Sequence, residues 1–339
     1  RTAHFPQHIP VMRGLDHFML ALTYAIGGLR LSRPDVLLMY SPPLPISLAA
    51  GLLSRRFHCP FVLNVQDIFP QSAIDLGVLK QPTLIRFFRW LEKAIYRRAD
   101  HITVHSEGNR RDVGAKVGDI DKVSVMHNWI DTESLRPGPR DNAFSAENGL
   151  DGQFVVSFAG TMGYSQDLDT VLAAAYLLRE EMAIRFLLVG DGVETPRLKA
   201  IAAELELPNV LWVPMQPRER YPQVPHASDV CLVTLHKNVG TPVVPSKLLS
   251  IMAAGRPALV SLPLEGDAPG IVRDAACGIC VAPEQPRALA DAVLELYRDP
   301  GLCRRFGTSG RTYIERHFAA TSAAARYEAL FTQLTDERK

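Results

Sequence analysis

The 339-residue sequence lacks both an excess of charge and a disulfide framework. Its 37 basic and 36 acidic residues leave a formal net charge of +1, which gives no basis for general affinity for nucleic acid. The five cysteines are odd in number and irregularly spaced, which is typical of a reducing compartment. Cys277 and Cys280 lie within an alternating apolar run with no helix signal after it, so two buried strand residues are favoured over a redox pair.

Long hydrophobic runs are also missing. The most apolar window near the start, Phe18–Leu29, is too short and too rich in glycine to span a membrane, and no secretory signal peptide is evident. We therefore expect a cytoplasmic protein. The chain begins at Arg1 rather than methionine and its first segment reads as a fragment, so we also expect residues upstream.

Clusters of metal ligands are absent from the sequence as well. Asp167-Leu168-Asp169 and Asp119-Ile120-Asp121 have the D-x-D spacing of some metal-dependent enzymes, but the first opens a predicted helix, where aspartate is favoured in any case. No grouped His/Cys pattern appears. The sequence predicts neither a metal site nor a cofactor.

What the sequence does contain is a regular alternation of short apolar runs and amphipathic segments. The runs predict strands at Val36–Tyr40, Phe61–Val65, His101–His105, Val123–Met126, Phe154–Ala159, Ile184–Val189, Val210–Val213, Asp229–Leu235, Pro257–Ser261 and Gly278–Val281. The segments between them predict helices at Leu44–Arg56, Thr83–Arg98, Glu107–Val117, Leu168–Arg179, Pro196–Leu205, Ser246–Ala254 and Pro286–Tyr297. Strands that alternate with helices predict an α/β fold with parallel, doubly wound sheets.

The length of the chain predicts two such domains. A stretch rich in Pro, Gly, Asn and Asp, residues 137–152, is the best candidate for a linker. We therefore expect an N-terminal Rossmann-like domain over residues 1–136, truncated at its start, and a second over 153–312. Residues 313–339 form a further helical region, which we expect to pack back toward the N-terminal domain, and the two domains are expected to face a cleft.

The segment 236–257 combines a loop broken by Gly and Pro with one lysine and a short helix. Ser246 can cap this helix and Gly255 can end it. The start of the helix presents free N–H groups and a positive dipole end, which suit a phosphate, and Lys247 adds a positive charge there. The alternative is an ordinary strand–helix connection with a solvated lysine.

Two glycine-containing turns follow strands of the second half. The first of these strands ends in Phe158-Ala159-Gly160-Thr161-Met162-Gly163, and the glycines of this turn allow a ligand to approach the backbone. Gly190-Asp191-Gly192 ends the next, where Asp191 is more typical of a turn than of a catalyst.

Together these strings resemble the retaining GT-B glycosyltransferases of family 4. The resemblance rests on the two glycine turns and on Pro245-Ser246-Lys247 through Gly255-Arg256-Pro257. In the first half, Asp67-Ile68-Phe69-Pro70 and His127-Asn128-Trp129-Ile130-Asp131 look most like bacterial enzymes of surface-polysaccharide assembly, especially the N-acetyl-fucosamine transferase-like group. The resemblance covers about residues 36–330.

The resemblance implies transfer of a hexosyl or N-acetylhexosaminyl group from a nucleoside-diphosphate sugar, in the first place a UDP sugar, to a lipid-linked or saccharide acceptor, without a metal. Lys247 would stabilise the departing diphosphate, and Asp67 would act as an acceptor-side base or sugar ligand, although it can equally cap the turn before Pro70. The residues expected at the donor are Gly160, Thr161, Met162, Gly163, Gly190, Arg197, Lys199, Pro214, Met215, Thr241, Pro242, Ser246, Lys247 and Ser250.

The sequence also departs from the family pattern. Members often carry an acidic pair at the helix, where this chain has Pro242 and Ser250, and they often carry Arg and Lys after the first glycine, where it has Thr161 and Gln166. The family's first-domain histidine is replaced by Gln66. We therefore expect Lys247, with Arg197 or Lys199, to carry more of the diphosphate charge than is usual.

The segment Leu79–Arg98 is basic and amphipathic. Its apolar face holds Leu84, Phe87, Phe88, Leu91 and Ile95, and its six positive charges face one acid, Glu92. Such a helix can lie on the anionic cytoplasmic face of the inner membrane. The alternative is a helix packed on the core with a solvated basic side, and both can hold at once.

Two other functions stay open at this point. A nucleotide-sugar epimerase would need acids and a histidine at the sugar; the loops offer His236, but the sequence shows no acidic cluster beside it. A non-catalytic nucleotide-sugar binder is the other, because the acidic pair is missing. A dinucleotide dehydrogenase is disfavoured, because no full G-x-G-x-x-G follows a strand.

Overall fold

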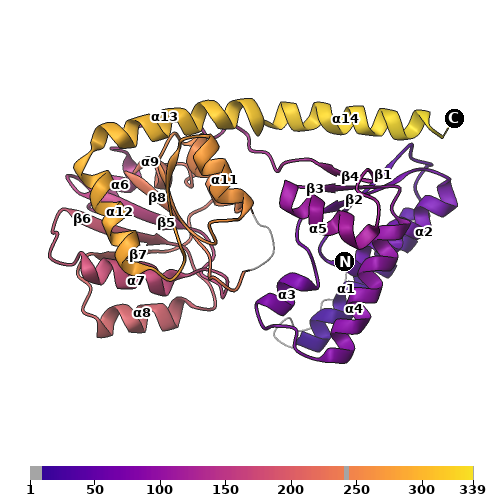
Figure 1. Ribbon diagram of the computed structural model, residues 1–339, viewed down its shortest axis with the longest axis horizontal. Coiled ribbons are helices and arrows are strands. Elements are labelled where there is room, and N and C mark those ends of the chain that lie inside the picture. Colours follow the sequence, from indigo (N-terminus) through magenta and orange to yellow (C-terminus); the bar gives the residue numbers. More distant parts are fainter. Residues whose placement is uncertain (1–9, 240–243, 339) are drawn as a thin grey trace. The chain divides into compact units, whose positions relative to one another are not determined.

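A computed structural model describes residues 10–239 and 244–338 and divides the chain into two units (Figure 1). The described part of the first unit comprises residues 10–127 and 323–338, and that of the second unit comprises 128–239 and 244–322. Each unit contains one parallel sheet with helices around it, which confirms the predicted fold class.

The first unit is built on a four-stranded sheet of order β1-β2-β3-β4. Its strands are β1 (Leu37–Ser41), β2 (Phe61–Val65), β3 (His101–Val104) and β4 (Val123–Val125). Its helices are α1 (Pro10–Gly28), the 3₁₀ turn η1 (Leu44–Ile46), α2 (Ser47–Phe57), α3 (Gln71–Asp75), α4 (Pro82–Arg98), α5 (Glu107–Val117) and the greater part of α14 (Ala320–Asp336).

The second unit is built on a six-stranded sheet of order β10-β9-β8-β5-β6-β7. Its strands are β5 (Phe154–Ala159), β6 (Ile184–Val189), β7 (Val210–Val213), β8 (Val230–Thr234), β9 (Ala258–Ser261) and β10 (Gly278–Val281). Its helices are α6 (Ala143–Glu147), α7 (Leu168–Leu177), α8 (Thr195–Glu204), α9 (Gln223–His226), α10 (Ser246–Ala253), α11 (Asp267–Asp274), α12 (Pro286–Arg298) and α13 (Pro300–His317).

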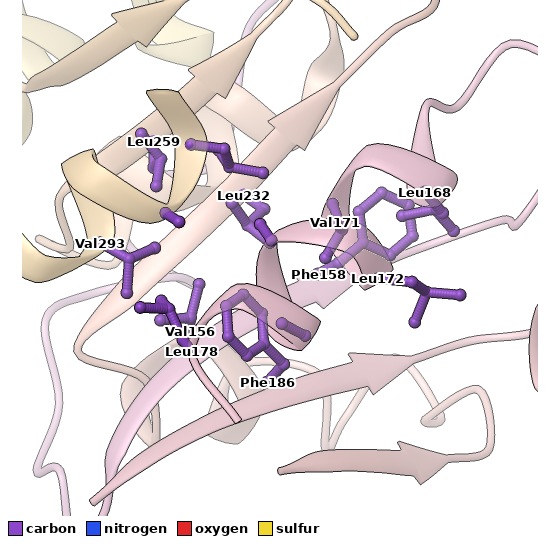
Figure 2. Packing of buried hydrophobic residues seen from close by; sticks show 14 of the residues in the cluster. Val156, Phe158, Leu168, Val171, Leu172, Leu178, Phe186, Leu232, Leu259 and Val293 are labelled. Carbon is purple, nitrogen blue, oxygen red and sulfur yellow. The ribbon is translucent and has the colours of Figure 1, made fainter. Parts of the chain in front are cut away.

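Alternation along the strands of the second unit fills both faces of its sheet. Val156 and Phe158 of β5 pack under α7 and α12, in the cluster drawn in Figure 2, while Val155 packs on the other face with Phe144 of α6. Burial on both faces explains why these strands read as continuous apolar runs.

All ten predicted strands are present to within one or two residues, and so are six of the seven helices predicted between them; the segment predicted as a helix at Leu44–Arg56 is divided into the 3₁₀ turn η1 and the helix α2, which begins at Ser47. The predicted C-terminal helical region is two helices, α13 and α14. The helix is interrupted at Phe318 and Ala319, where Ile130 forms a bridge with Ala319 and the Ile130 N–H donates to the Phe318 carbonyl at 3.0 Å.

Residues 137–152 behave as a packed segment of the second unit. Phe144 and Leu150 are fully buried in its core, Arg140 bonds to Asp229, and Arg256 donates to the Gly138 carbonyl at 3.0 Å. The polar composition that suggests a linker arises because caps and turns surround α6, including a capping box at Asn142.

In the described part of the chain, no helix is both long enough and apolar enough to span a bilayer.

Candidate active site

The strand order of the second unit reverses between β5 and β8, because β6 and β7 lie on one side of β5 and β9 and β10 lie beyond β8. All the strands are parallel, so their carboxyl ends share one edge of the sheet. In open α/β sheets ligands bind outside this edge, at the point of reversal. The loop after β5 therefore faces the loop from β8 to α10, and the His236 N–H bonds to the Ser165 carbonyl between them at 3.0 Å.

Gly160 follows β5 in a conformation that only glycine tolerates, with φ of +143°. Its N–H donates to the Val189 carbonyl at 2.9 Å, which fixes the start of the loop. Gly190 has a similar φ of +145°, and a Cβ there would come within 1.9 Å of the Gly160 carbonyl oxygen. Gly190 is thus required by the close approach of the two turns, whether or not a ligand is bound.

Lys247, in the first turn of α10, reaches over this loop. Its Nζ donates to Gln166 Oε1 at 2.7 Å and lies 3.8 Å from the centroid of the Phe158 ring. A Cβ built on Gly160 would be 3.6 Å from the same Nζ. The lysine and the glycine loop, which are far apart in the sequence, therefore meet at the point where the strand order reverses.

The surroundings of Lys247 provide little compensation for its charge. Burial lowers the pKa of the Lys247 amine to about 7. Within residues 10–239 and 244–338, no carboxylate forms an ion pair with it, and its contacts are a neutral amide and an aromatic face. A buried amine of this kind gains much from an anionic ligand, because the ligand restores the stability of its charged form.

The start of α10 differs in detail from the sequence prediction. Ser246 is the first residue of the helix and not its cap; the N-cap is Pro245, and no side chain bonds to the first-turn N–H groups. The Leu248 N–H donates to the Pro245 carbonyl at 2.9 Å, so the N–H groups of Ser246 and Lys247 are the ones that a ligand can meet. Gly255 ends the helix region as predicted, with φ of +67°.

Arg197 is engaged by two carboxylates. Its guanidinium forms a bidentate pair with Asp169 at 2.7 and 2.8 Å and bonds to Glu194 at 2.7 Å. Those partners offset the charge that the sequence assigns to the donor site. Lys199, two residues further along α8, is exposed, with its Nζ 5.7 Å from the ring centroid of Trp212.

Met162 supports the loop from within. Its side chain is fully buried in the core, its N–H donates to the Asp191 carbonyl at 2.9 Å, and its carbonyl accepts from the Glu194 N–H at 3.1 Å. All of its polar backbone atoms are thus used by the protein, which leaves the neighbouring Thr161 and Gly163 to face a ligand; Thr161 is exposed.

The other predicted donor residues lie along the carboxyl edge of the second sheet or outside the described residues. Pro214 and Met215 follow β7 and are exposed, and the hydroxyl of Ser250, on α10, bonds to that of Tyr221. Thr241 and Pro242 lie outside the described residues.

An acidic pair beside His236 corrects one sequence expectation. His236 Nδ1 lies 3.7 Å from Glu284 and 3.9 Å from the buried Asp167, and Lys237 bonds to Glu284 at 2.7 Å. Glu284 follows β10 and Asp167 precedes α7, so only the fold brings them to His236. Across the described ranges, no three His, Cys, Asp or Glu side chains are arranged to hold a metal ion.

Gln166 and Phe158 are the contacts of Lys247 that sequence reasoning missed. Gln166 is noted in the sequence only for not being a lysine, and Phe158 only as a strand residue. The signal available was the alternation of β5, which places Phe158 on the face that α7 covers.

Asp67 follows β2 at the carboxyl edge of the first sheet. Its carboxylate is half-buried, and burial raises its pKa, while hydrogen bonds from the Ser72 hydroxyl and the Ile68 N–H oppose the rise. Beside it, Gln66 Nε2 donates to Asn64 Oδ1 at 2.7 Å, and the Asn64 amide donates to the hydroxyl of Tyr327 on α14.

Comparison with known proteins agrees with this architecture. Residues 140–313 match the family described as Glycosyl transferases group 1, and residues 4–129 match the Glycosyl transferase 4-like domain. The chain is 27% identical to the probable glycosyltransferase WbjE of Pseudomonas aeruginosa, with 96% of the chain and 82% of the relative covered. It is 24% identical to the putative colanic acid biosynthesis glycosyl transferase WcaI of Escherichia coli K12, over 92% and 77%.

Among solved structures, HepE of Anabaena in complex with UDP has a TM-score of 0.76 to the chain at 15% identity. The match covers 93% of this chain and 82% of HepE. At this identity the likeness concerns the fold alone, and that fold is GT-B.

Proposed function

The chain belongs to the group 1 glycosyltransferases, and on that basis we propose that it transfers a sugar from a UDP sugar to a lipid-linked or saccharide acceptor during synthesis of a surface polysaccharide. The polysaccharide context is supported by WbjE and by the colanic acid enzyme WcaI, and the UDP donor by the UDP complex of HepE. The transferred group would be hexosyl or N-acetylhexosaminyl, with retention of its anomeric configuration, as the family resemblance implies.

The observation that carries this proposal is the position of Lys247 over the Gly160 loop, at the reversal of the strand order. As the bond to the sugar breaks, negative charge grows on the departing diphosphate. Preorganised N–H dipoles and a cation at that charge stabilise the transition state more than the ground state. The N–H groups of Thr161 and Gly163 and those at the start of α10 would supply the dipoles, and Lys247 the cation.

We propose that the transfer needs no metal ion, because Lys247 would hold the positive charge that a divalent cation provides in other glycosyltransferases. The weak compensation of its charge supports this role, since a diphosphate would replace contacts with neutral groups only. On the acceptor side, Asp67 would accept a hydrogen bond or a proton from the attacking hydroxyl. Its raised pKa places its basicity closer to the working pH than that of an exposed aspartate.

The test is product analysis with a panel of UDP sugars and other nucleoside-diphosphate sugars, offered with a sugar linked to a lipid diphosphate. We expect an elongated lipid-linked product with one donor and unchanged turnover in EDTA. Substitution Lys247→Ala should lower kcat by about 10²–10³, as for loss of one transition-state donor.

Three outcomes would contradict the proposal. An epimerised nucleotide sugar without transfer would indicate an isomerase, in which His236 and Glu284 could exchange protons. Binding of donors without turnover by any of them would indicate a sugar-nucleotide binder. An unchanged kcat in Lys247→Ala would remove Lys247 from the mechanism.

A further inference from the structure

Two helices of the first unit, α1 and α4, lie side by side (Figure 1). Both expose large apolar side chains. The contact between them includes the rings of Phe18 and Phe87, whose centroids are 6.4 Å apart. The exposed apolar residues around this contact are Met19, Leu22, Ile26, Leu84, Phe87 and Trp90, and we call them the apolar strip.

The spacing of these residues places them in two rows that adjoin. On α4, Leu84, Phe87 and Trp90 follow one another at intervals of three, and Trp90 is 63% exposed. On α1, Leu22 lies one turn after Phe18 on the same side of the helix. Because Phe18 contacts Phe87, the two rows meet, whereas residues such as Leu91 and Ile95 of α4 face the core.

A row of positive charge runs along α4 beside the apolar strip. Its members are exposed and recur on one side of the helix: Arg86, Arg89, Lys93 and Arg97. The one acid of α4, Glu92, is buried and bonds to Lys116 of α5 at 3.0 Å. It therefore does not offset the basic row at the surface.

The apolar strip and the basic row together indicate what binds to this surface. A second copy of the chain would bring its own basic row against the first if it met the surface face to face, and like charges in such an interface are unfavourable. An anionic lipid bilayer satisfies both features, because apolar and aromatic side chains enter below the headgroups while arginine and lysine meet the phosphates. Trp90 lies between the apolar strip and the basic row, and a tryptophan in such a position is also typical of a membrane interface.

We infer that α1 and α4 together form a surface that docks on a membrane carrying anionic lipid, with the helices in the plane of the interface. The surface goes beyond the α4 contact expected from sequence, because α1 supplies half of the apolar strip. This inference rests on the proposed function only in one respect: a lipid-linked acceptor would lie in such a membrane. Binding of the protein to vesicles does not itself require turnover.

The charge arm of the test measures binding of the full chain to phosphatidylcholine vesicles with and without phosphatidylglycerol. We expect binding only with the anionic lipid and a fall with added salt. Neutralising Arg86→Gln, Arg89→Gln and Lys93→Gln should weaken it by about 10²-fold, at about fivefold per charge. The matched control neutralises three exposed arginines of the second unit, Arg287→Gln, Arg298→Gln and Arg304→Gln, and should bind as the parent does.

The apolar arm separates the two-helix surface from its alternatives. Leu22→Gln with Ile26→Gln, and separately Trp90→Ala, should each weaken vesicle binding by about tenfold or more while far-ultraviolet circular dichroism stays unchanged, since these side chains are exposed. Equal binding to neutral and anionic vesicles, or full binding by the α1 variant, would overturn the proposal. So would a dimer, seen by sedimentation velocity, that these substitutions dissociate in a protein that does not bind vesicles.

An assay with a water-soluble acceptor distinguishes a failure of this inference from a failure of the proposed function. We expect the α1 and α4 variants to turn over that acceptor at the parent rate and to lose activity only on vesicles. Vesicle binding by a protein without transferase activity would leave the surface standing and refute the function.

Discussion

Binding of a nucleoside diphosphate should draw a proton onto Lys247. The amine has a pKa of about 7 in the free protein, because burial disfavours its charged form. A diphosphate within hydrogen-bond distance would favour the charged form and return the pKa toward its usual value. At pH 8 about nine-tenths of the free amines are neutral, so binding should take up about 0.9 proton per site. At pH 7 the expected uptake is about 0.5, and at pH 6 it is below about 0.1.

Isothermal titration calorimetry with UDP measures this uptake directly. The observed enthalpy is recorded in buffers of different ionisation enthalpy at one pH, and its slope gives the number of protons bound. Affinity for UDP should also fall about tenfold per pH unit above pH 7, until the pKa of the complex is reached. Lys247→Met should abolish both effects, while His236→Gln serves as a control for histidine protonation. Equal uptake in the parent and in Lys247→Met, or none in the parent at pH 8, would refute the reasoning.

The lowered pKa of Lys247 also makes the free energy of unfolding depend on pH. The folded pKa of Lys247 lies below the value of 10.5 expected for an unfolded chain, so between about pH 7 and 10.5 the unfolded state holds the extra proton. The free energy of unfolding contributed by this group therefore rises with pH through that window, and below pH 7 the penalty of a buried charge is fully present. Comparing urea unfolding of the parent and Lys247→Met from pH 7 to 8.5 should show the steeper rise in the parent.

Three further predictions follow from particular contacts. Gly160→Ala should weaken UDP binding by at least about tenfold, because a φ of +143° is strained for alanine and the loop under Lys247 must shift; parent-like affinity in calorimetry would contradict this. Arg197→Gln should change the donor KM less than about threefold, because its two carboxylate partners already engage the guanidinium; a large rise in KM would show that the ligand recruits it. Tyr327→Phe should lower the free energy of unfolding by about 1–3 kcal/mol, because the buried Asn64 amide loses an acceptor, and a urea midpoint unchanged within error would disprove that account.

The sequence predicts the fold well because its signals are local. Strands buried on both faces require apolar runs, such as Phe154–Ala159, and parallel strands require helices between them, so both periodicities are visible without knowledge of tertiary contacts. Short helices such as α6 and α9 are missed, since one turn carries too little periodicity to detect. The C-terminal helices are merged in the prediction because the break between them, at Phe318 and Ala319, contacts Ile130, which is distant in the sequence.

The candidate site is predictable only in part, for the same reason. The Gly160 turn and the start of α10 have local signatures, and their meeting follows from the rule on strand order. The contact of Lys247 with Gln166, the pairing of Arg197 with Asp169, and the acids beside His236 are all tertiary, and none has a sequence pattern. The altered pKa of Lys247 depends on burial, which spacing alone does not give.

The most direct test of the account is a crystal structure of the chain with UDP bound. We expect the diphosphate outside the carboxyl ends of β5 and β8, with Lys247 Nζ about 3 Å from a phosphate oxygen. The N–H groups of Thr161, Gly163, Ser246 and Lys247 should be directed at the phosphates. A complex with Lys247 still bonded to Gln166 alone and the nucleotide bound at another edge of the sheet would contradict the central claim.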